Sequence, residues 1–183
     1  EKLTNLKTLF LDNNKIEKIS GLDTLVNLER LDLWANDIMQ IEGLHALTSL
    51  KSLNLNRNKI SYIEGLNNLE NLRELRLDRN QITEIRGLEH LKKLNVLDLS
   101  NNHIPEIKGL NSLKNLKVLY LWSNQISKIR GLDQLTKLEN LQIIDNKIEK
   151  IEGLDNLVKL KSLNLSKNRI SKIEGLDNLQ NLE

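Results

Sequence analysis

The stretch LKSLNLSKNRISKIEGL, residues 160–176, holds most of a 22-residue unit that recurs along the chain. All eight glycines occupy one position of this unit, from Gly21 to Gly175 at intervals of 22 residues. The copies share the pattern LxxLxLxxNxIxxIxGLxxL without an insertion, and Ile143 replaces a framework leucine. A fixed period of about 20–30 residues is typical of a solenoid, in which each copy packs mainly against its neighbours.

Each copy divides into a strand and a return segment. The LxL core alternates apolar and polar residues, which predicts a short strand with its leucines facing inward. Stacked copies would then form a parallel sheet, and the remaining residues of each copy would supply the return crossover. The GLxxL segment is too short for a standard α-helix and suits a 3₁₀ turn or one helical turn. We therefore expect an α/β solenoid of eight full 22-residue repeats, with a concave parallel sheet and a short 3₁₀ or turn-like convex side.

Two polar positions of the unit have a structural explanation. An asparagine recurs in every copy, from Asn14 to Asn168. We expect it to form a buried ladder that satisfies the backbone donors and acceptors of a tight turn. The glycine is expected where φ is positive, or where two backbones approach too closely for a Cβ. The framework leucines and isoleucines are explained by folding alone and indicate no cofactor site.

The composition excludes several classes of protein. Lysine and arginine total 27 against 25 acidic residues, so the clustered basic excess of a nucleic-acid-binding protein is missing. The chain has no cysteine, which excludes disulfides and thiolate chemistry. No run approaches the roughly 20 apolar residues that a membrane span needs, and no hydrophobic signal segment opens the chain. We expect a cytoplasmic protein that binds neither nucleic acid nor a membrane.

The outward positions of the strands are free of folding constraints, so function is expected there. They hold both tryptophans, the single phenylalanine and one of the two tyrosines. The register predicts two apolar patches, one formed by Phe10 and Trp34 and a larger one formed by Val96, Val118, Tyr120, Trp122 and Ile144. Exposed apolar patches on a soluble chain usually indicate a binding site. An alternative is that these rings only stack on neighbouring strands, or that they serve contacts between copies of the chain.

An arginine-rich stretch separates the two patches. Arg57, Arg76 and Arg79 lie near Glu74 and Asp78, and these charges could also neutralise one another across strands. Aromatic and arginine side chains on a rigid surface are typical of protein interfaces. The predicted partner-binding residues are Phe10, Arg30, Trp34, Arg57, Arg76, Asp78, Arg79, Val96, Val118, Tyr120, Trp122 and Ile144.

The sequence offers no convincing catalytic or metal site. His45, His90 and His103 lie in different copies without a shared metal-ligand spacing. Asp98 and Ser100 are outward positions of one strand, whereas His103 lies past the turn, so the three do not suggest a triad. The aspartates are scattered and do not form a calcium cage. We therefore expect no enzyme activity, no catalytic or metal-binding residue and no cofactor.

The phrases KIEGLDNL (150–157) and LKSLNLSKNRISKIEGL (160–176) resemble the leucine-rich repeat family. They are most similar to the 22-residue class typified by the leucine-rich regulatory subunit of protein phosphatase 1. Bacterial internalins also use 22-residue repeats, with a different turn segment. The resemblance covers residues 3–182. It implies a right-handed, curved solenoid whose concave sheet binds other macromolecules, and it suggests a regulatory role.

We interpret residues 1–183 as a single repeat domain, with partial repeats at 1–5 and 180–183 and no evident caps. The leading hypothesis is a non-catalytic protein-interaction module that uses its concave sheet. The alternatives are an engineered or consensus repeat scaffold, and a self-associating structural segment of a longer multidomain protein. Uncapped solenoid ends expose core residues, here Leu3, Leu6, Leu179 and Leu182, which predicts possible end-to-end self-association.

Overall fold

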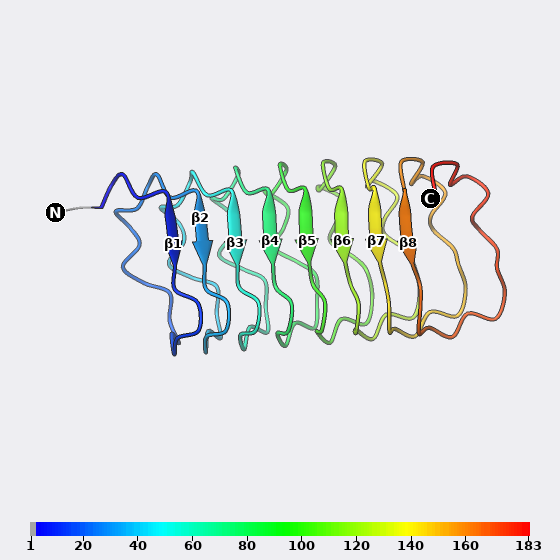
Figure 1. Cartoon of the computed structure of the whole chain (residues 1–183), viewed down its shortest axis with the longest axis horizontal. Helices are drawn as coiled ribbons and strands as arrows, with labels where there is room; N and C mark the ends of the chain where they lie inside the picture. Colours follow the sequence, from blue (N-terminus) through cyan, green and yellow to red (C-terminus); the bar gives the residue numbers. More distant parts are fainter. Residues whose placement is uncertain (1–2) are drawn as a thin grey trace.

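The computed structural model describes residues 3–183, in which eight short strands form one parallel sheet (Figure 1). The strands are β1 (Thr8–Phe10), β2 (Arg30–Asp32), β3 (Ser52–Asn54), β4 (Glu74–Arg76), β5 (Val96–Asp98), β6 (Val118–Tyr120), β7 (Asn140–Gln142) and β8 (Ser162–Asn164). They follow one another in chain order, and equivalent residues of adjacent copies are in register, as in Leu75↔Leu97. The predicted solenoid with a parallel sheet is therefore confirmed.

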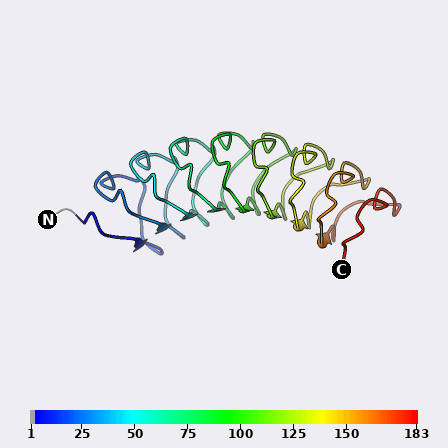
Figure 2. The ribbon, with the colours of Figure 1, turned by 90° about the horizontal axis from the view of Figure 1, so that it is seen from above.

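The stack of copies is curved. Figure 2 shows an arch with the strands along its inner side and the turns along its outer side. The middle leucine of each strand from β2 to β7 is fully buried, while the residues on either side of it face out of the core. The outward residues of the strands therefore form the concave surface, as the alternation of the LxL core predicts.

The return segment consists of tight turns. Leu91 N donates to Leu88 O at 3.0 Å, and Leu94 N donates to Leu91 O at 3.0 Å. Inward leucines recur every three residues here, and this spacing fits turns closed by bonds from residue i+3 to residue i. No helix is present in residues 3–183, so the α part of the expected α/β class is not found. The chain turns back before a full helical segment can form.

The core is continuous through the stack and opens at both ends. Every framework leucine and isoleucine of the second to seventh copies is buried. In the first and eighth copies the following are only partly buried: Leu6, Leu9, Leu11, Ile16, Leu163, Leu165, Ile170 and Leu176. Ile173 is 84% exposed, although its equivalent Ile151 is 7% exposed. The difference arises because each copy is covered by its neighbours, and the terminal copies have a neighbour on one side.

The asparagine ladder is confirmed from Asn36 to Asn168 and links adjacent copies, whereas Asn14 is exposed and bonds only within its own copy. Asn102 Nδ2 donates to Leu77 O at 3.0 Å and to Leu99 O at 3.1 Å. Its Oδ1 accepts a hydrogen bond from Ile82 N at 2.9 Å. One amide thus satisfies backbone groups of its own copy and of the preceding copy. Equivalent bonds recur from Asn36 to Asn168.

Both expected reasons for the glycine are confirmed. Gly109 has φ +73°, and a Cβ built there would lie 2.4 Å from Ile85 O of the preceding copy. A second left-handed position, just before each ladder asparagine, was not predicted; there φ is +54° at Ala35 and Arg57 and +55° at Lys167. The sequence gives only a partial sign of it, because Asn13, Asn101 and Asp145 favour such a backbone whereas the other five copies carry alanine, arginine, serine or lysine there.

Candidate functional site

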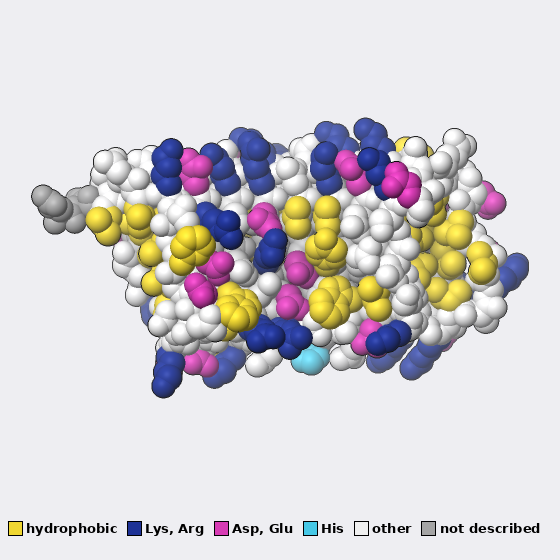
Figure 3. Space-filling model, viewed as in Figure 1, with side chains coloured by type: hydrophobic (Ala, Val, Ile, Leu, Met, Phe, Trp, Pro, Cys, Tyr) yellow, Lys and Arg dark blue, Asp and Glu magenta, His cyan; other side chains and the backbone are white. Residues whose placement is uncertain are grey.

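The concave sheet carries two apolar groups with charged residues between them. Figure 3 shows one yellow group over the first strands, a second over the middle of the sheet, and basic and acidic side chains between them. We call Phe10 and Trp34 the N-terminal patch. We call Val96, Val118, Tyr120, Trp122 and Ile144 the central patch. Parallel register places the members of each patch on adjacent strands, as in Val96↔Val118.

Arginines cover the rings of the N-terminal patch. The Arg30 guanidinium lies 5.4 Å from the centre of the Phe10 ring, and that of Arg57 lies 5.3 Å from the Trp34 ring. These are cation–π distances. Phe10 remains 58% exposed and Trp34 is half-buried, so both rings can still contact another molecule. The predicted alternative is that the rings stack on neighbouring strands. In the structure each ring is instead covered by an arginine of the next copy.

A shallow depression joins the N-terminal patch to the arginine-rich stretch. It is lined by Phe10, Asp12, Asp32, Trp34, Asn54, Asn56 and Arg76. The sequence places Asp12, Asp32, Asn54 and Asn56 in the outward columns but does not single them out. Polar residues are usual on a solvated surface. The only sequence signal for these four is that they occupy the same outward repeat positions as Phe10 and Trp34.

The other arginines have acidic neighbours. Arg76 Nη2 lies 2.6 Å from Glu74 Oε1, and Arg79 Nε lies 3.7 Å from Asp78 Oδ2. Arg76 and Glu74 belong to the same strand, so this pair neutralises charge within β4. Arg57 has no carboxylate partner among residues 3–183, and its contact is the Trp34 ring. The predicted neutralisation thus applies to Arg76 and Arg79 but not to Arg57.

The central patch surrounds polar groups. Its five side chains are half-buried. Asp98 lies in register with Tyr120, and its Oδ1 accepts a hydrogen bond from Ser100 N at 3.0 Å. Burial raises the pKa of the Asp98 carboxyl above its ordinary value. The Ser100 side chain is fully buried, and its hydroxyl has no hydrogen-bond partner among residues 3–183.

Paired charges line one edge of the sheet, just before the strands. Glu29 lies 2.6 Å from Lys51 and 3.6 Å from Lys7. Glu139 lies 3.0 Å from Lys117 and 3.6 Å from Lys161. Hydrogen bonding to Lys51 lowers the pKa of Glu29, and hydrogen bonding to Lys117 lowers that of Glu139. Each glutamate links three successive copies and lies between two lysines, so this edge of the sheet keeps a net positive charge.

One aromatic side chain lies away from the concave face. Tyr62 belongs to a return segment and is 49% exposed, and the Arg86 guanidinium lies 4.7 Å from its ring centre. Met39, also in a return segment, is 55% exposed. The sequence does not predict this pair of exposed side chains.

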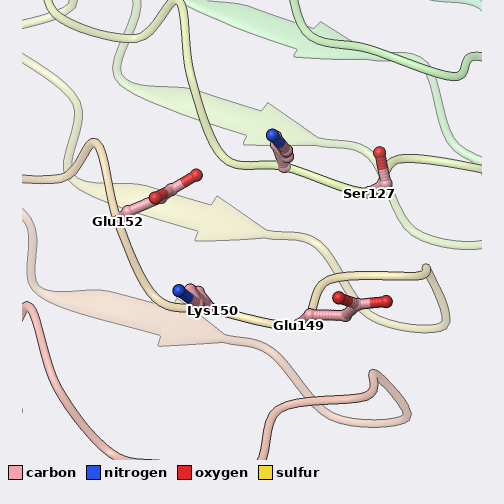
Figure 4. Close-up of a pocket in the computed structure, with 5 residues that line it drawn as sticks. Ser127, Glu149, Lys150 and Glu152 are labelled. Atoms are coloured by element: carbon pink, nitrogen blue, oxygen red, sulfur yellow. The ribbon is translucent and has the colours of Figure 1, made fainter.

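Histidine and acidic side chains are spread along residues 3–183. No group of three or more histidine, cysteine, aspartate or glutamate side chains lies close enough to hold a metal ion there. His103 is exposed, and the nearby Ser100 hydroxyl makes no hydrogen bond in that range. A hollow on the return side is lined by Ser127, Lys128, Glu149, Lys150 and Glu152, but Figure 4 shows that their polar ends do not converge. The same residue range contains no helix with the length and apolarity needed to cross a membrane.

The stacked strand–turn units and the concave sheet define a repeat solenoid with a broad surface for macromolecules. Family models confirm the type of repeat. A model described as leucine-rich repeats in two copies matches residues 26–68, 70–112 and 114–156, and single-repeat models match 5–28 and 159–182. The chain belongs to the leucine-rich repeat family. These models describe the family as a whole, so the phosphatase-subunit class remains a prediction.

Solved structures agree with this assignment. Internalin C2 from Listeria monocytogenes is 35% identical with a TM-score of 0.92, over 98% of this chain and 80% of that one. A leucine-rich repeat protein of Leptospira interrogans is 30% identical with a TM-score of 0.90, over 98% of this chain and 48% of that one. The TLR13–ssRNA13 complex is 26% identical with a TM-score of 0.79, over 99% of this chain and 33% of that one. No match was found among curated proteins.

Proposed function

We propose that this protein is a non-catalytic interaction module that binds a protein partner on its concave sheet. The observation that carries the proposal is the position of the large side chains. The framework positions hold leucine and isoleucine in every copy. Phe10 and Tyr120 lie on strands β1 and β6, and Trp34 and Trp122 follow strands β2 and β6 by two residues. Members of the leucine-rich repeat family typically act as interaction modules, which supports the same conclusion.

The geometry favours a protein over a nucleic acid as the partner. The TLR13 structure contains single-stranded RNA. The concave columns of this chain carry Asp12, Asp32, Glu74, Asp78 and Asp98 against Arg30 and Arg76. Phosphate binding depends on a local excess of positive charge, and these columns lack one. Aromatic, aliphatic and mixed charged groups are instead the usual composition of protein-binding hot spots.

A pull-down from the source cell tests the proposal. The wild-type chain is compared with a Trp34→Ala, Trp122→Ala double variant and with Tyr62→Ala as the matched control. Truncating an aromatic hot spot should cost about 2 kcal/mol or more, so the double variant should lose its concave partner. The control should retain that partner, because Tyr62 lies on a return segment. Retention of every partner by the double variant would show that the concave site is wrong.

A regulatory role like that of the phosphatase subunit is a narrower form of this proposal. The resemblance implies a concave surface that combines aromatic and acidic residues. Phe10 and Tyr120 fit the aromatic part, whereas Asn54, Arg76 and Gln142 interrupt the acidic part. Gel filtration with the catalytic subunit of protein phosphatase 1 tests it. A stable complex is expected if the resemblance extends to the partner, and two separate peaks would exclude this role.

End-to-end self-association is a second candidate, favoured by the exposed core at the ends. Ile173 is 84% exposed, Leu3 is 63% exposed and Leu182 is 36% exposed. Sedimentation at increasing concentration should then show dimers or longer assemblies, and Ile173→Lys should shift them toward monomers. A wild-type chain that sediments as a monomer throughout would contradict self-association while leaving the concave site intact.

A further inference from the structure

We propose that the central patch binds a basic side chain of the partner, with the Asp98 carboxylate as its anionic contact. The partner would thus present an arginine or lysine beside apolar residues. This inference rests on the proposed concave binding site and specifies the chemistry of its middle part. Three observations support it: Asp98 has a free acceptor oxygen, Arg76 is bonded to Glu74, and the carboxylate lies beside apolar side chains.

The Asp98 carboxylate has an unused acceptor oxygen. Its Oδ1 accepts a hydrogen bond from Ser100 N at 3.0 Å, and its other oxygen has neither a hydrogen bond nor an ion pair among residues 3–183. Asp32 occupies the same column, and both of its oxygens are engaged. They accept from Trp34 N at 3.0 Å and from Asn54 Nδ2 at 3.2 Å. Asp98 is therefore less satisfied than its structural equivalent.

The nearest basic residue compensates Asp98 only in part. Arg76 lies opposite Asp98 in the parallel register, but both its Nε and its Nη2 bind Glu74 at 2.6 Å. On the other side of Asp98 the register places Tyr120, which carries no positive charge. The neighbouring Asp78 adds negative charge, although Asn101 donates to it at 2.7 Å and Arg79 lies at 3.7 Å. The surface around Asp98 therefore keeps a carboxylate without an ion-pair partner, which Arg76 compensates only in part.

The surroundings of Asp98 favour a partner that carries a positive charge. Figure 3 shows acidic side chains directly beside the yellow group in the middle of the sheet. Burial already disfavours the ionised carboxyl and raises its pKa. The buried Ser100 hydroxyl beneath this surface also lacks a partner within the described chain. A docked protein would remove more water, so an unpaired Asp98 would become costly and a cation on the partner would offset that cost.

A long basic side chain suits this arrangement better than a small cation. Arginine and lysine carry an apolar stem and a charged head. The stem can lie on Val96, Val118 and Tyr120, while the head reaches the free oxygen of Asp98. An arginine head could also stack on the rings of Tyr120 or Trp122. The chain already contains such arginine–ring contacts, at Phe10 and Trp34.

Asp98→Asn tests the charge without disturbing the fold. Copies three and eight carry asparagine in this column, and they make the same turn bond. Asn54 Oδ1 accepts from Asn56 N at 3.1 Å, and Asn164 Oδ1 accepts from Ser166 N at 3.0 Å. The asparagine variant should therefore keep the turn. Asp32→Asn is the matched control, because it removes the same charge from the same column outside the central patch.

The experiment uses peptides selected from a random peptide library on the immobilised wild-type chain. Selected peptides whose binding depends on Trp122, identified with Trp122→Ala, should carry arginine or lysine beside aromatic or aliphatic residues. Fluorescence anisotropy then compares each arginine peptide with its citrulline analogue, which has the same shape without the charge. The citrulline change should weaken binding about tenfold or more on the wild type and on Asp32→Asn, and hardly at all on Asp98→Asn.

The possible results separate the inference from the proposed function. The role of Asp98 would be overturned if the Trp122-dependent peptides lacked a basic residue. It would also be overturned if their binding were unchanged by citrulline and by Asp98→Asn. Neither result would contradict the concave site. Equal citrulline effects on wild type and Asp98→Asn would assign the basic residue to another carboxylate and also overturn the inference. A library without any Trp122-dependent peptide would contradict the proposed function of the central patch itself.

Discussion

At the scale of single residues, some positions of the repeat are constrained by contact with the preceding copy. The glycine is the clearest of these. Gly21 and Gly109 have nearly the same backbone, with φ +74° and +73°. A Cβ at Gly109 would lie 2.4 Å from Ile85 O, whereas at Gly21 it would meet nothing within 4 Å. The two sites therefore separate the effect of backbone conformation from that of close packing.

Gly109→Ala should be clearly more destabilising than Gly21→Ala. Both substitutions place an alanine in a left-handed backbone, which costs about 1–2 kcal/mol. Gly109→Ala also forces a Cβ against a backbone carbonyl, which should add about 1–3 kcal/mol. Urea unfolding followed by circular dichroism measures both variants. Equal losses of unfolding free energy would mean that close packing between copies is not what requires the glycine.

Asn102→Ala should be more destabilising than Asn14→Ala. The first substitution leaves Ile82 N without its acceptor inside the core, while Leu77 O and Leu99 O keep the bonds from Asn80 and Asn124, and we expect a loss of about 1–3 kcal/mol. Asn14 is exposed and donates within its own copy, to Leu11 O and Asp12 O, so its loss should be below about 1 kcal/mol. Thermal unfolding of the two variants checks this order. A ladder role would be excluded if Asn102→Ala were as stable as the wild type.

Asp98 should make the stability of the fold depend on pH in an unusual direction. Burial raises its pKa above the ordinary 3.8, so the folded chain holds this proton more firmly than the unfolded chain. Its contribution to stability is therefore largest at low pH and falls as pH rises from 3.8 to the raised pKa. Asp98→Asn should be more stable than the wild type near pH 7, and this gain should shrink toward about pH 3. A gain independent of pH in urea unfolding would contradict this account.

At the scale of the elements, each strand is stabilised by the strands on both sides. Leu97 in β5 is fully buried, whereas Leu163 in β8 is only partly buried, although both are the middle residue of the same LxL core. The pattern alone makes these two leucines equal. Their difference comes from the stack, because β8 has one neighbouring strand in the sheet.

Leu97→Ala should therefore cost more than Leu163→Ala. Removing a fully buried leucine side chain typically costs about 2–5 kcal/mol, through lost burial and a residual cavity. At the partly open Leu163 the loss should be nearer 1 kcal/mol, since water already reaches the site. Denaturant unfolding of both variants gives the comparison. Equal costs would indicate that the terminal copy is packed as firmly as the central ones.

The strands and return segments also show which structural features the sequence predicts. The period of the glycines and the alternation of the LxL core predict all eight strands and the face of their residues. The prediction is wrong for Ser100, which is expected to face outward but lies beyond β5 and is fully buried. The pattern did not predict the left-handed backbone at Ala35 and Arg57, because those side chains do not require it. It also assigned an α part that tight turns replace. Whether Arg76 turns toward Glu74 or toward Asp98 depends on side-chain rotamers, which no repeat pattern specifies.

At the scale of the whole molecule, the arch presents one continuous surface of outward strand residues. Its side chains differ between copies, while the core beneath them repeats. Trp34 and Trp122 occupy the same position of the repeat, four copies apart. At about 4.8 Å per strand, they are separated by roughly 20 Å. A partner that contacts both patches would therefore lie along the inner side of the arch. The return side contains Met39 and Tyr62, which provide an internal comparison.

Hydroxyl-radical footprinting of the complex with the partner recovered from the pull-down tests the concave site most directly. This labelling modifies exposed aromatic and methionine side chains, so one measurement reports on both faces of the arch. Binding should protect Phe10, Trp34, Tyr120 and Trp122, while Met39 and Tyr62 keep the labelling rate of the free chain. Protection of Met39 and Tyr62 with unchanged labelling of the two tryptophans would place the partner on the return side and contradict the account.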